Sequence, residues 1–227
     1  MLSVIEKVLS REQVAEVRDA LMNAPWHDGK VSAGGLAVQR KSNQQLLDSS
    51  ETAKQLQQYL LRVLGGNAQF ISAALPNKIY PPKFNCYQQG DTYGNHIDGA
   101  IMTLPPNGES LRTDVSATLF LSDPDEYQGG ELTIETTYGA QQVKLQAGDM
   151  VLYPATSLHR VNPITAGERV ASFFWIQSLV RDAEQRSSLY DLDQSIQSLT
   201  AALGPEHDDV VRLSGVYHNL IRRWSDC

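Results

Sequence analysis

Residues 94–100 read GNHIDGA, with His96 and Asp98 two positions apart between glycines. In a β-strand, residues i and i+2 point to the same face, so this spacing predicts an imidazole nitrogen beside a carboxylate oxygen. Such a pair supplies two ligands of a metal site. A third ligand has to come from another part of the chain.

The composition limits what the chain can be. It has 227 residues, 41% hydrophobic and 20% charged, which is typical of one large folded domain or a domain with a small appendage. Lysine and arginine number 19 against 26 aspartate and glutamate, so the net charge is −7. No basic run of five or more residues occurs, and we therefore expect neither nucleic acid nor an anionic membrane as a partner.

The cysteines and the N-terminus indicate the compartment. Cys86 and Cys227 stand far apart, which excludes a disulfide framework and a cysteine zinc site within one chain. The N-terminus meets a charge at Glu6, and neither a basic segment with a long apolar run nor a small-residue cleavage site follows. These features predict a cytoplasmic protein without a membrane segment.

The first part of the chain, residues 1–67, is predicted as a helical and strand flank packed on the core. Ser10 and Gln13 have the spacing of a capping box, and apolar residues then recur at helical spacing until Pro25. A second helix is expected from Ser50 to the glycines at 65–66, where a left-handed residue ends many helices.

Residues 68–180 change to short apolar runs broken by Gly, Pro, Asn and Asp. The runs are FISAAL, KFNCYQ, VSATLFLS, ELTIET, QQVKL, DMVLYP and RVASFFWIQS. Many short strands without helical patterns between them are typical of an antiparallel sandwich or barrel of the jelly-roll kind. The fold class expected is therefore mainly β with flanking helices, α+β, around a jelly-roll core.

Residues 181–227 return to helical spacing. Leucines and an isoleucine recur between Leu189 and Leu203, Gly204-Pro205 breaks the pattern, and a second apolar stripe runs from Val210 to Trp224. The two stripes predict a helical hairpin that packs either on the core or on a second subunit. The second alternative predicts a homo-oligomer.

The strand-rich region offers one candidate for the third ligand. His159 follows the strand in DMVLYP, 61 positions after Asp98, whereas the other histidines outside the GNHIDGA stretch lie in loops or helical segments. Two imidazoles and one carboxylate leave part of a metal's coordination sphere open, as in non-haem Fe(II) oxygenases. The sequence thus favours His96, Asp98 and His159 as an open iron site.

Arg169 follows ten positions later, at the start of an apolar strand. A buried arginine is costly unless an anion accompanies it, and its planar guanidinium suits a carboxylate. We therefore expect Arg169 to hold the distal end of a dicarboxylate chelated to the metal. Tyr87, just before the His-x-Asp pair, could reach the same molecule, although Tyr87 or Tyr93 could instead be structural.

These motifs together resemble a known family. His96-x-Asp98, His159 and Arg169, with CYQQGDTYGNHID, GGEL and AGDMVLYP around them, resemble the Fe(II)- and 2-oxoglutarate-dependent dioxygenases of the prolyl 4-hydroxylase type. Over nearly its full length the chain is similar to the bacterial PKHD-type hydroxylases, which are associated with iron uptake.

The resemblance implies a double-stranded β-helix, the family's form of the jelly roll, with Fe(II) bound by His96, Asp98 and His159. Arg169 would bind the 5-carboxylate of 2-oxoglutarate, and Tyr87 would touch the same cosubstrate. The implied reaction consumes 2-oxoglutarate and O2, hydroxylates an unidentified substrate and releases succinate and CO2. L-ascorbate, as the reductant that keeps iron as Fe(II), is implied by the family alone.

Other functions stay open at this point. The chain could be a jelly-roll protein that binds iron or a small molecule as a sensor without turnover, or a hydrolase that uses zinc at the same ligands. Ser157 beside His159 could belong to a hydrolytic pair, but no Gly-x-Ser-x-Gly stretch surrounds it. The long polar segment at residues 100–114 is expected to be a loop bordering the substrate.

Overall fold

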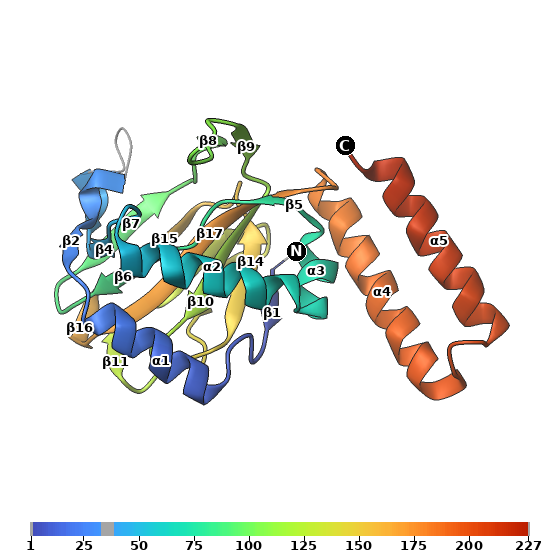
Figure 1. Cartoon of the computed structure of the whole chain (residues 1–227), viewed down its shortest axis with the longest axis horizontal. Coiled ribbons are helices and arrows are strands. Elements are labelled where there is room, and N and C mark those ends of the chain that lie inside the picture. The colour runs from blue at the N-terminus through green and yellow to red at the C-terminus, as the bar shows by residue number, and fades with distance from the viewer. Residues whose placement is uncertain (1, 33–38, 227) are drawn as a thin grey trace.

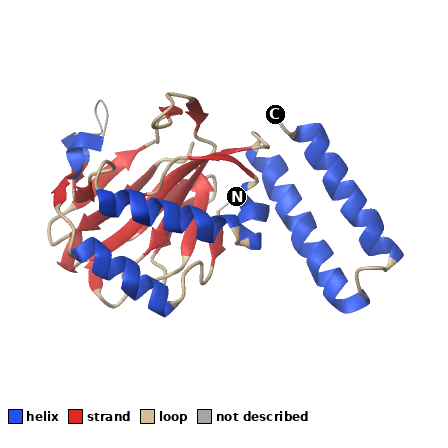
Figure 2. Cartoon of the chain, viewed as in Figure 1, coloured by secondary structure: helices blue, strands red, loops and turns tan. Residues whose placement is uncertain are grey.

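The chain forms two facing antiparallel sheets with helices outside them (Figures 1 and 2). The computed structural model describes residues 2–32 and 39–226. The larger sheet has the order β1-β14-β10-β17-β6-β4-β2, and β5 pairs with β17. Its strands are β1 (Ser3–Ile5), β14 (Met150–Pro154), β10 (Val115–Phe120), β17 (Arg169–Ser178), β6 (Lys83–Tyr87), β4 (Gln44–Leu46), β2 (Trp26–Asp28) and β5 (Pro76–Ile79).

The smaller sheet has the order β13-β12-β15-β7-β3. Its strands are β13 (Gly139–Val143), β12 (Leu132–Thr136), β15 (His159–Val161), β7 (Thr92–His96) and β3 (Lys41–Ser42). All the strand pairings among the described residues of both sheets are antiparallel, as the short-strand pattern predicts. The mainly β architecture with flanking helices is therefore confirmed.

Two helices cover the outer face of the larger sheet (Figure 1). The helix α1 (Arg11–Met22) starts at the predicted capping box, with Ser10 accepting from the Gln13 backbone, and α2 (Glu51–Gly65) starts at Ser50. A short 3-10 helix, η1 (Gly29–Ser32), follows β2. The apolar stripes of α1 and α2 face the sheet because apolar surface is removed from water there.

The larger sheet is buried on both faces. Its outward residues, such as Phe84 and Phe174, pack with the helices, whereas its inward residues, such as Tyr87 and Phe120, pack against the smaller sheet. Strand β10 lies between β14 and β17, and all six of its residues are buried. Functional side chains on the inner face are consequently held between two packed layers.

One predicted strand is wrong. FISAAL belongs to a helix, α3 (Ala68–Ala74), which begins where the Asn67 side chain accepts from the Phe70 backbone and ends at Leu75 in the left-handed conformation. An apolar run of this length has no periodicity that separates a strand from one buried turn of helix. The capping residue Asn67 was the available signal.

The segment at residues 100–114 is also more ordered than the sequence suggested. It forms a two-stranded hairpin, β8 (Ile101–Thr103) and β9 (Ser110–Arg112), rather than a loop. A second small pair joins β11 (Tyr127–Gly129) to β16 (Ile164–Gly167). At Gly129 the φ angle is +71°, and a Cβ there would lie 2.1 Å from the Pro163 carbonyl oxygen, so the pair requires glycine at this position.

The C-terminal helices form the predicted hairpin, α4 (Ala183–Leu203) and α5 (Asp208–Trp224), beside the sheets (Figure 1). Leu75, Val180 and Leu189 make a separate buried cluster where the hairpin meets the core. Arg186 is 4% exposed and donates to the backbone oxygens of Val180 and Arg181, at 2.8 and 2.7 Å. The hairpin is thus attached by apolar contacts and by a buried guanidinium.

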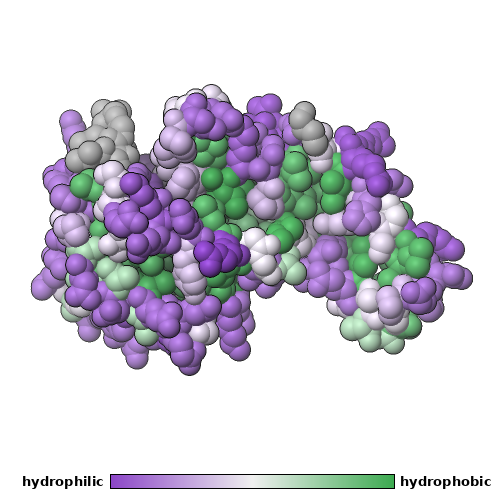
Figure 3. All heavy atoms as spheres, viewed as in Figure 1, coloured by the Kyte–Doolittle hydropathy of each residue, from purple (hydrophilic) through white to green (hydrophobic). Residues whose placement is uncertain are grey.

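Hydrophilic side chains cover most of the face shown in Figure 3, and apolar side chains gather near the junction of the hairpin with the core. Among the described residues, none of the helices combines the length and the apolar character that a membrane span requires.

Candidate metal centre

His96, Asp98 and His159 meet in the space between the sheets. His96 is the last residue of β7, His159 is the first of β15, and the antiparallel register puts them directly opposite each other. A single strand pairing therefore brings His159 to His96, although 63 positions separate them in the chain. The structure brings the three predicted residues together.

Asp98 reaches the site by a different route from the one that its spacing suggested. Strand β7 ends at His96, so His96 and Asp98 do not share a strand face by alternation. Ile97 is 59% exposed, whereas the Asp98 side chain is 9% exposed and lies beside His159. The chain turns after His96 and directs the carboxylate inward.

The three side chains can share one cation. One donor atom from each lies within 4.8 Å of the others, and His159 Nε2 is 3.8 Å from Asp98 Oδ2. Metal–nitrogen and metal–oxygen bonds of about 2.0–2.2 Å place neighbouring ligand atoms roughly 3–4 Å apart. Two nitrogens and one oxygen, without sulfur, suit iron or a similar divalent metal.

Backbone carbonyls fix which nitrogen of each imidazole can bind a metal. His96 Nδ1 lies 2.8 Å from the Gly94 oxygen, and His159 Nδ1 lies 3.0 Å from the Ser157 oxygen. A carbonyl oxygen only accepts, so Nδ1 carries the proton and donates in both residues. Each neutral ring therefore keeps the Nε2 lone pair for a metal.

Strand β10 supports Asp98, which the sequence did not reveal. The Ser116 hydroxyl donates to Asp98 Oδ2 at 2.6 Å, and Ser116 is 2% exposed. The Thr113 hydroxyl donates to the Gly99 oxygen at 2.7 Å, while the Thr113 backbone donates to Ala100. These bonds hold the segment after β7 against the larger sheet and orient the carboxylate.

The surroundings of His96 favour its neutral form. Burial, and next the neighbouring His159, lower the pKa of His96 from 6.5 to about 4. The Tyr93 ring stacks on His96 with centroids 3.6 Å apart, and the Tyr153 ring meets His159 edge-on. At neutral pH the His96 nitrogen that faces the site is therefore unprotonated and available to a metal.

Arg169 and Tyr87 lie at another end of the same pocket. They are direct partners across β17 and β6, and each is 1% exposed. The guanidinium carbon of Arg169 is 5.6 Å from the centre of the Tyr87 ring and 5.1 Å from that of Phe120. Burial raises the pKa of Tyr87, with Arg169 acting in the opposite direction, so its hydroxyl stays protonated and can donate.

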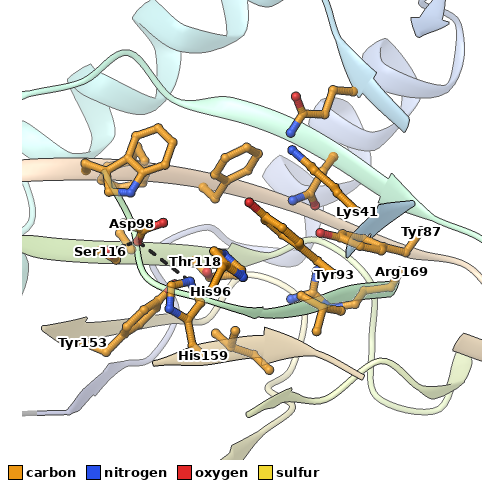
Figure 4. Close-up of a pocket in the computed structure, with 18 residues that line it drawn as sticks. Lys41, Tyr87, Tyr93, His96, Asp98, Ser116, Thr118, Tyr153, His159 and Arg169 are labelled. Atoms are coloured by element: carbon orange, nitrogen blue, oxygen red, sulfur yellow. Dashed lines mark hydrogen bonds and ion pairs between the residues drawn. The ribbon is translucent and has the colours of Figure 1, made fainter. Parts of the chain in front are cut away.

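One pocket contains both groups. Figure 4 shows Asp98, His96 and His159 on one side of it and Arg169 with Tyr87 on the other. Its volume of about 70 Å³ exceeds the roughly 10–15 Å³ that one water needs, so a small organic anion fits. No residue of 100–114 is among the described residues that line it, and the expected contact of that segment with substrate stays a prediction.

The acids of the AGDMVLYP and GGEL stretches, Asp149 and Glu131, have structural partners. Asp149 accepts from the Lys7 backbone at 2.8 Å, and Glu131 accepts from the Asn162 side chain at 3.1 Å. Neither belongs to the described lining of the pocket. His207 caps α5 by accepting from the Asp209 backbone, far along the chain from the sheets.

Two family models match the chain. Residues 82–177 match the 2OG-Fe(II) oxygenase superfamily, and residues 183–226 match the PKHD-type hydroxylase C-terminal domain. A PKHD-type hydroxylase of Pseudoalteromonas atlantica is 58% identical over 227 residues, covering 100% of both chains. Another from Acidovorax ebreus is 56% identical over 225 residues, covering 99% of each.

Solved structures share the fold at low identity. A Pseudomonas putida prolyl-4-hydroxylase matches with a TM-score of 0.53 and 20% identity, covering 78% of this chain and 92% of that one. HygX from Streptomyces hygroscopicus, solved with nickel and 2-oxoglutarate bound, matches with a TM-score of 0.53 and 15% identity, over 78% and 82% of the two chains.

The lowered pKa of His96 predicts a stability that depends on pH in metal-free protein. Below pH 6.5 the unfolded chain binds a proton that folded His96 takes up only near pH 4, so stability falls as pH falls through this window. Between pH 7 and pH 5 the loss is about 2 kcal/mol for this group. Urea unfolding with a chelator present measures it.

The variant His96→Gln removes the imidazole. Between pH 7 and pH 5 its free energy of unfolding should therefore fall by about 2 kcal/mol less than that of the wild type. His27→Gln, at an exposed position, is the matched control and should follow the wild type. Equal pH dependence in wild type and His96→Gln would contradict the assigned environment of His96.

Proposed function

From the premise that the chain belongs to the PKHD-type hydroxylases, and is thus a 2-oxoglutarate-dependent hydroxylase, we propose that the pocket described above is its active site. In this proposal His96, Asp98 and His159 bind Fe(II). Arg169 and Tyr87 bind 2-oxoglutarate from the opposite side.

The observation that carries this proposal is the state of Arg169. It is 1% exposed, its Nε is buried without a hydrogen-bond partner, and no carboxylate of the described residues forms an ion pair with it. A buried cation is strongly unfavourable unless an anion compensates it. A dicarboxylate that reaches from the metal to Arg169 would supply that anion. Neither a zinc hydrolase nor an iron sensor requires a buried guanidinium at this position.

The residues of the chain have separate tasks in this reaction. Fe(II) supplies the activation of O2 that couples oxidation of 2-oxoglutarate, to succinate and CO2, with hydroxylation of the substrate. Arg169 offers two parallel N–H groups to the distal carboxylate, and Tyr87 offers its hydroxyl. The rings of Tyr87 and Phe120 exclude water from the guanidinium, which strengthens its interaction with an anion.

The proposal includes finer points that rest on the resemblance and composition. L-ascorbate would act as the reductant that returns oxidised iron to Fe(II), and the enzyme would work in the cytoplasm in connection with iron uptake. Residues 68–180 would form the catalytic jelly-roll domain, with 1–67 as a packed flank. The extension at 181–227 would offer a surface for a homo-oligomer.

Spectroscopy of the whole chain tests the proposed function. Fe(II) and 2-oxoglutarate added without oxygen should give the visible charge-transfer band of a chelated keto acid, and admission of air should then release succinate. The variant His159→Ala, with its fold checked by circular dichroism, should lose both signals. A folded wild-type protein that gives neither the charge-transfer band nor succinate would contradict the proposed function.

Arg169→Leu should weaken binding of 2-oxoglutarate about 100-fold, because loss of one partner of a buried charge pair costs about 2–5 kcal/mol. Metal affinity should remain within a few-fold, since Arg169 is not a ligand. Calorimetry with Mn(II)-loaded protein measures both constants. Arg169→Lys keeps the charge without the planar fork, so its affinity for 2-oxoglutarate should lie between those of the wild type and Arg169→Leu. Equal loss of metal binding and 2-oxoglutarate binding in Arg169→Leu would show that Arg169 has a structural role instead.

Ser116→Ala should lower Fe(II) affinity by about 10- to 100-fold, as expected when a hydrogen bond that orients a metal ligand is removed. Ser116→Thr keeps the hydroxyl and serves as the control. Competition with a colorimetric chelator gives the two affinities. Metal binding that is unchanged in Ser116→Ala would show that Asp98 needs no support from β10.

A further inference from the structure

A third part of the pocket is polar and has no task in the proposed reaction so far. Its lining includes Lys41 from β3, Gln45 from β4 and Asn85 from β6. Gln45 and Asn85 are direct cross-strand partners, so both side chains project from the same face of the larger sheet. Figure 4 shows Lys41 on the side of the pocket away from Asp98.

Two buried atoms of this group have no partner among the described residues. Gln45 Nε2 and Asn85 Oδ1 make no hydrogen bond there, and each residue is only 7% exposed. Buried side-chain nitrogens and oxygens nearly always have hydrogen-bond partners. A polar atom without one in the lining of a pocket therefore indicates that a ligand group binds there. Here one of the two atoms is a donor and the other an acceptor, and they belong to directly paired residues.

We propose that Lys41, Gln45 and Asn85 form a subsite for an amide group of the hydroxylated substrate. An amide carbonyl would accept from Gln45 Nε2, and the amide N–H would donate to Asn85 Oδ1. A carboxylate is the poorer match, because it has no hydrogen for Asn85 Oδ1. This inference rests on the proposed function of the pocket.

Lys41 adds positive charge to the same pocket. It is 4% exposed, and its Nζ lies 5.1 Å from the centre of the Tyr93 ring, which in turn stacks on His96. A carbonyl oxygen is the negative end of the amide dipole, so an ammonium in the same pocket favours a ligand that brings a carbonyl oxygen into it.

An apolar wall connects the subsite to the metal centre. Along β17 the inward residues include Ala171, opposite Asn85, then Phe173, and then Trp175, opposite Ser116. Ser116 holds Asp98, so the wall ends at a metal ligand. A substrate whose amide binds at Gln45 and Asn85 would place a hydrocarbon portion along Phe173 and Trp175, where its C–H bonds approach the reacting centre.

Nuclear magnetic resonance of the whole chain tests the subsite. The protein is loaded with Zn(II) in place of iron and with 2-oxoglutarate, and the side-chain amide signals of Gln45 and Asn85 are followed. Acetamide should shift both signals, and acetate should bind at least fivefold more weakly. Capped trialanine forms a second arm: its binding identifies a peptide as the source of the amide, and its exclusion identifies a small molecule.

Apolar substitutions of similar size complete the test. Gln45→Met and Asn85→Leu should each weaken acetamide binding at least fivefold, as followed by the Trp175 indole signal. Gln44→Met is the matched control, because Gln44 pairs with Cys86 and projects from the opposite face of β4. All three variants should keep the wild-type affinity for 2-oxoglutarate within threefold.

The outcomes separate this inference from the proposed function. Acetamide that leaves the two signals unmoved, or that binds wild type and variants equally, would overturn the subsite and leave water as its occupant. A tenfold loss of 2-oxoglutarate affinity in Gln45→Met or Asn85→Leu would also overturn it, by assigning the pair to the cosubstrate. Failure of the proposed function would appear instead as wild-type protein that binds no 2-oxoglutarate in the presence of metal.

Discussion

The pairing of β15 with β7 is the constraint on which the candidate site depends. It sets His159 opposite His96, although more than sixty residues separate them in the chain. Because side chains alternate between faces, a shift of one residue in this register would turn His159 away from the pocket. The register is fixed by burial of Leu132, Ile134 and Val161 on the same sheet, so the packing of the core and the geometry of the site depend on the same pairing.

The pocket concentrates charge in a part of the molecule that is otherwise apolar. Arg169, Lys41 and Asp98 all line it, between two packed sheets. Groups of this kind oppose folding unless they are compensated, and proteins retain such arrangements mainly at functional sites. The buried hydrogen bonds from Ser116 and from backbone carbonyls hold the donors before any ligand arrives, which reduces the reorganisation that binding requires.

Local patterns revealed much of this architecture. The capping residues Ser10 and Ser50 marked two helices, and the motif spacing suggested which histidines and which arginine would converge. Other features depend on tertiary contacts that no local pattern encodes. Ser116 becomes a support for Asp98 only through the packing of β10, whereas the helix at FISAAL had a local signal in its capping residue Asn67. Gln45 and Asn85 likewise are ordinary strand amides until their pairing leaves two atoms without partners.

The buried contacts of the C-terminal hairpin have a consequence for anyone who shortens this chain. Cutting at residue 182 would expose Leu75 and Val180 to water and leave the carbonyls that Arg186 satisfies without donors. Val180 continues directly from β17, the strand that carries Arg169. A truncated fragment would therefore leave part of its core exposed to water. The helical hairpin is an integral part of the fold and not a separable domain.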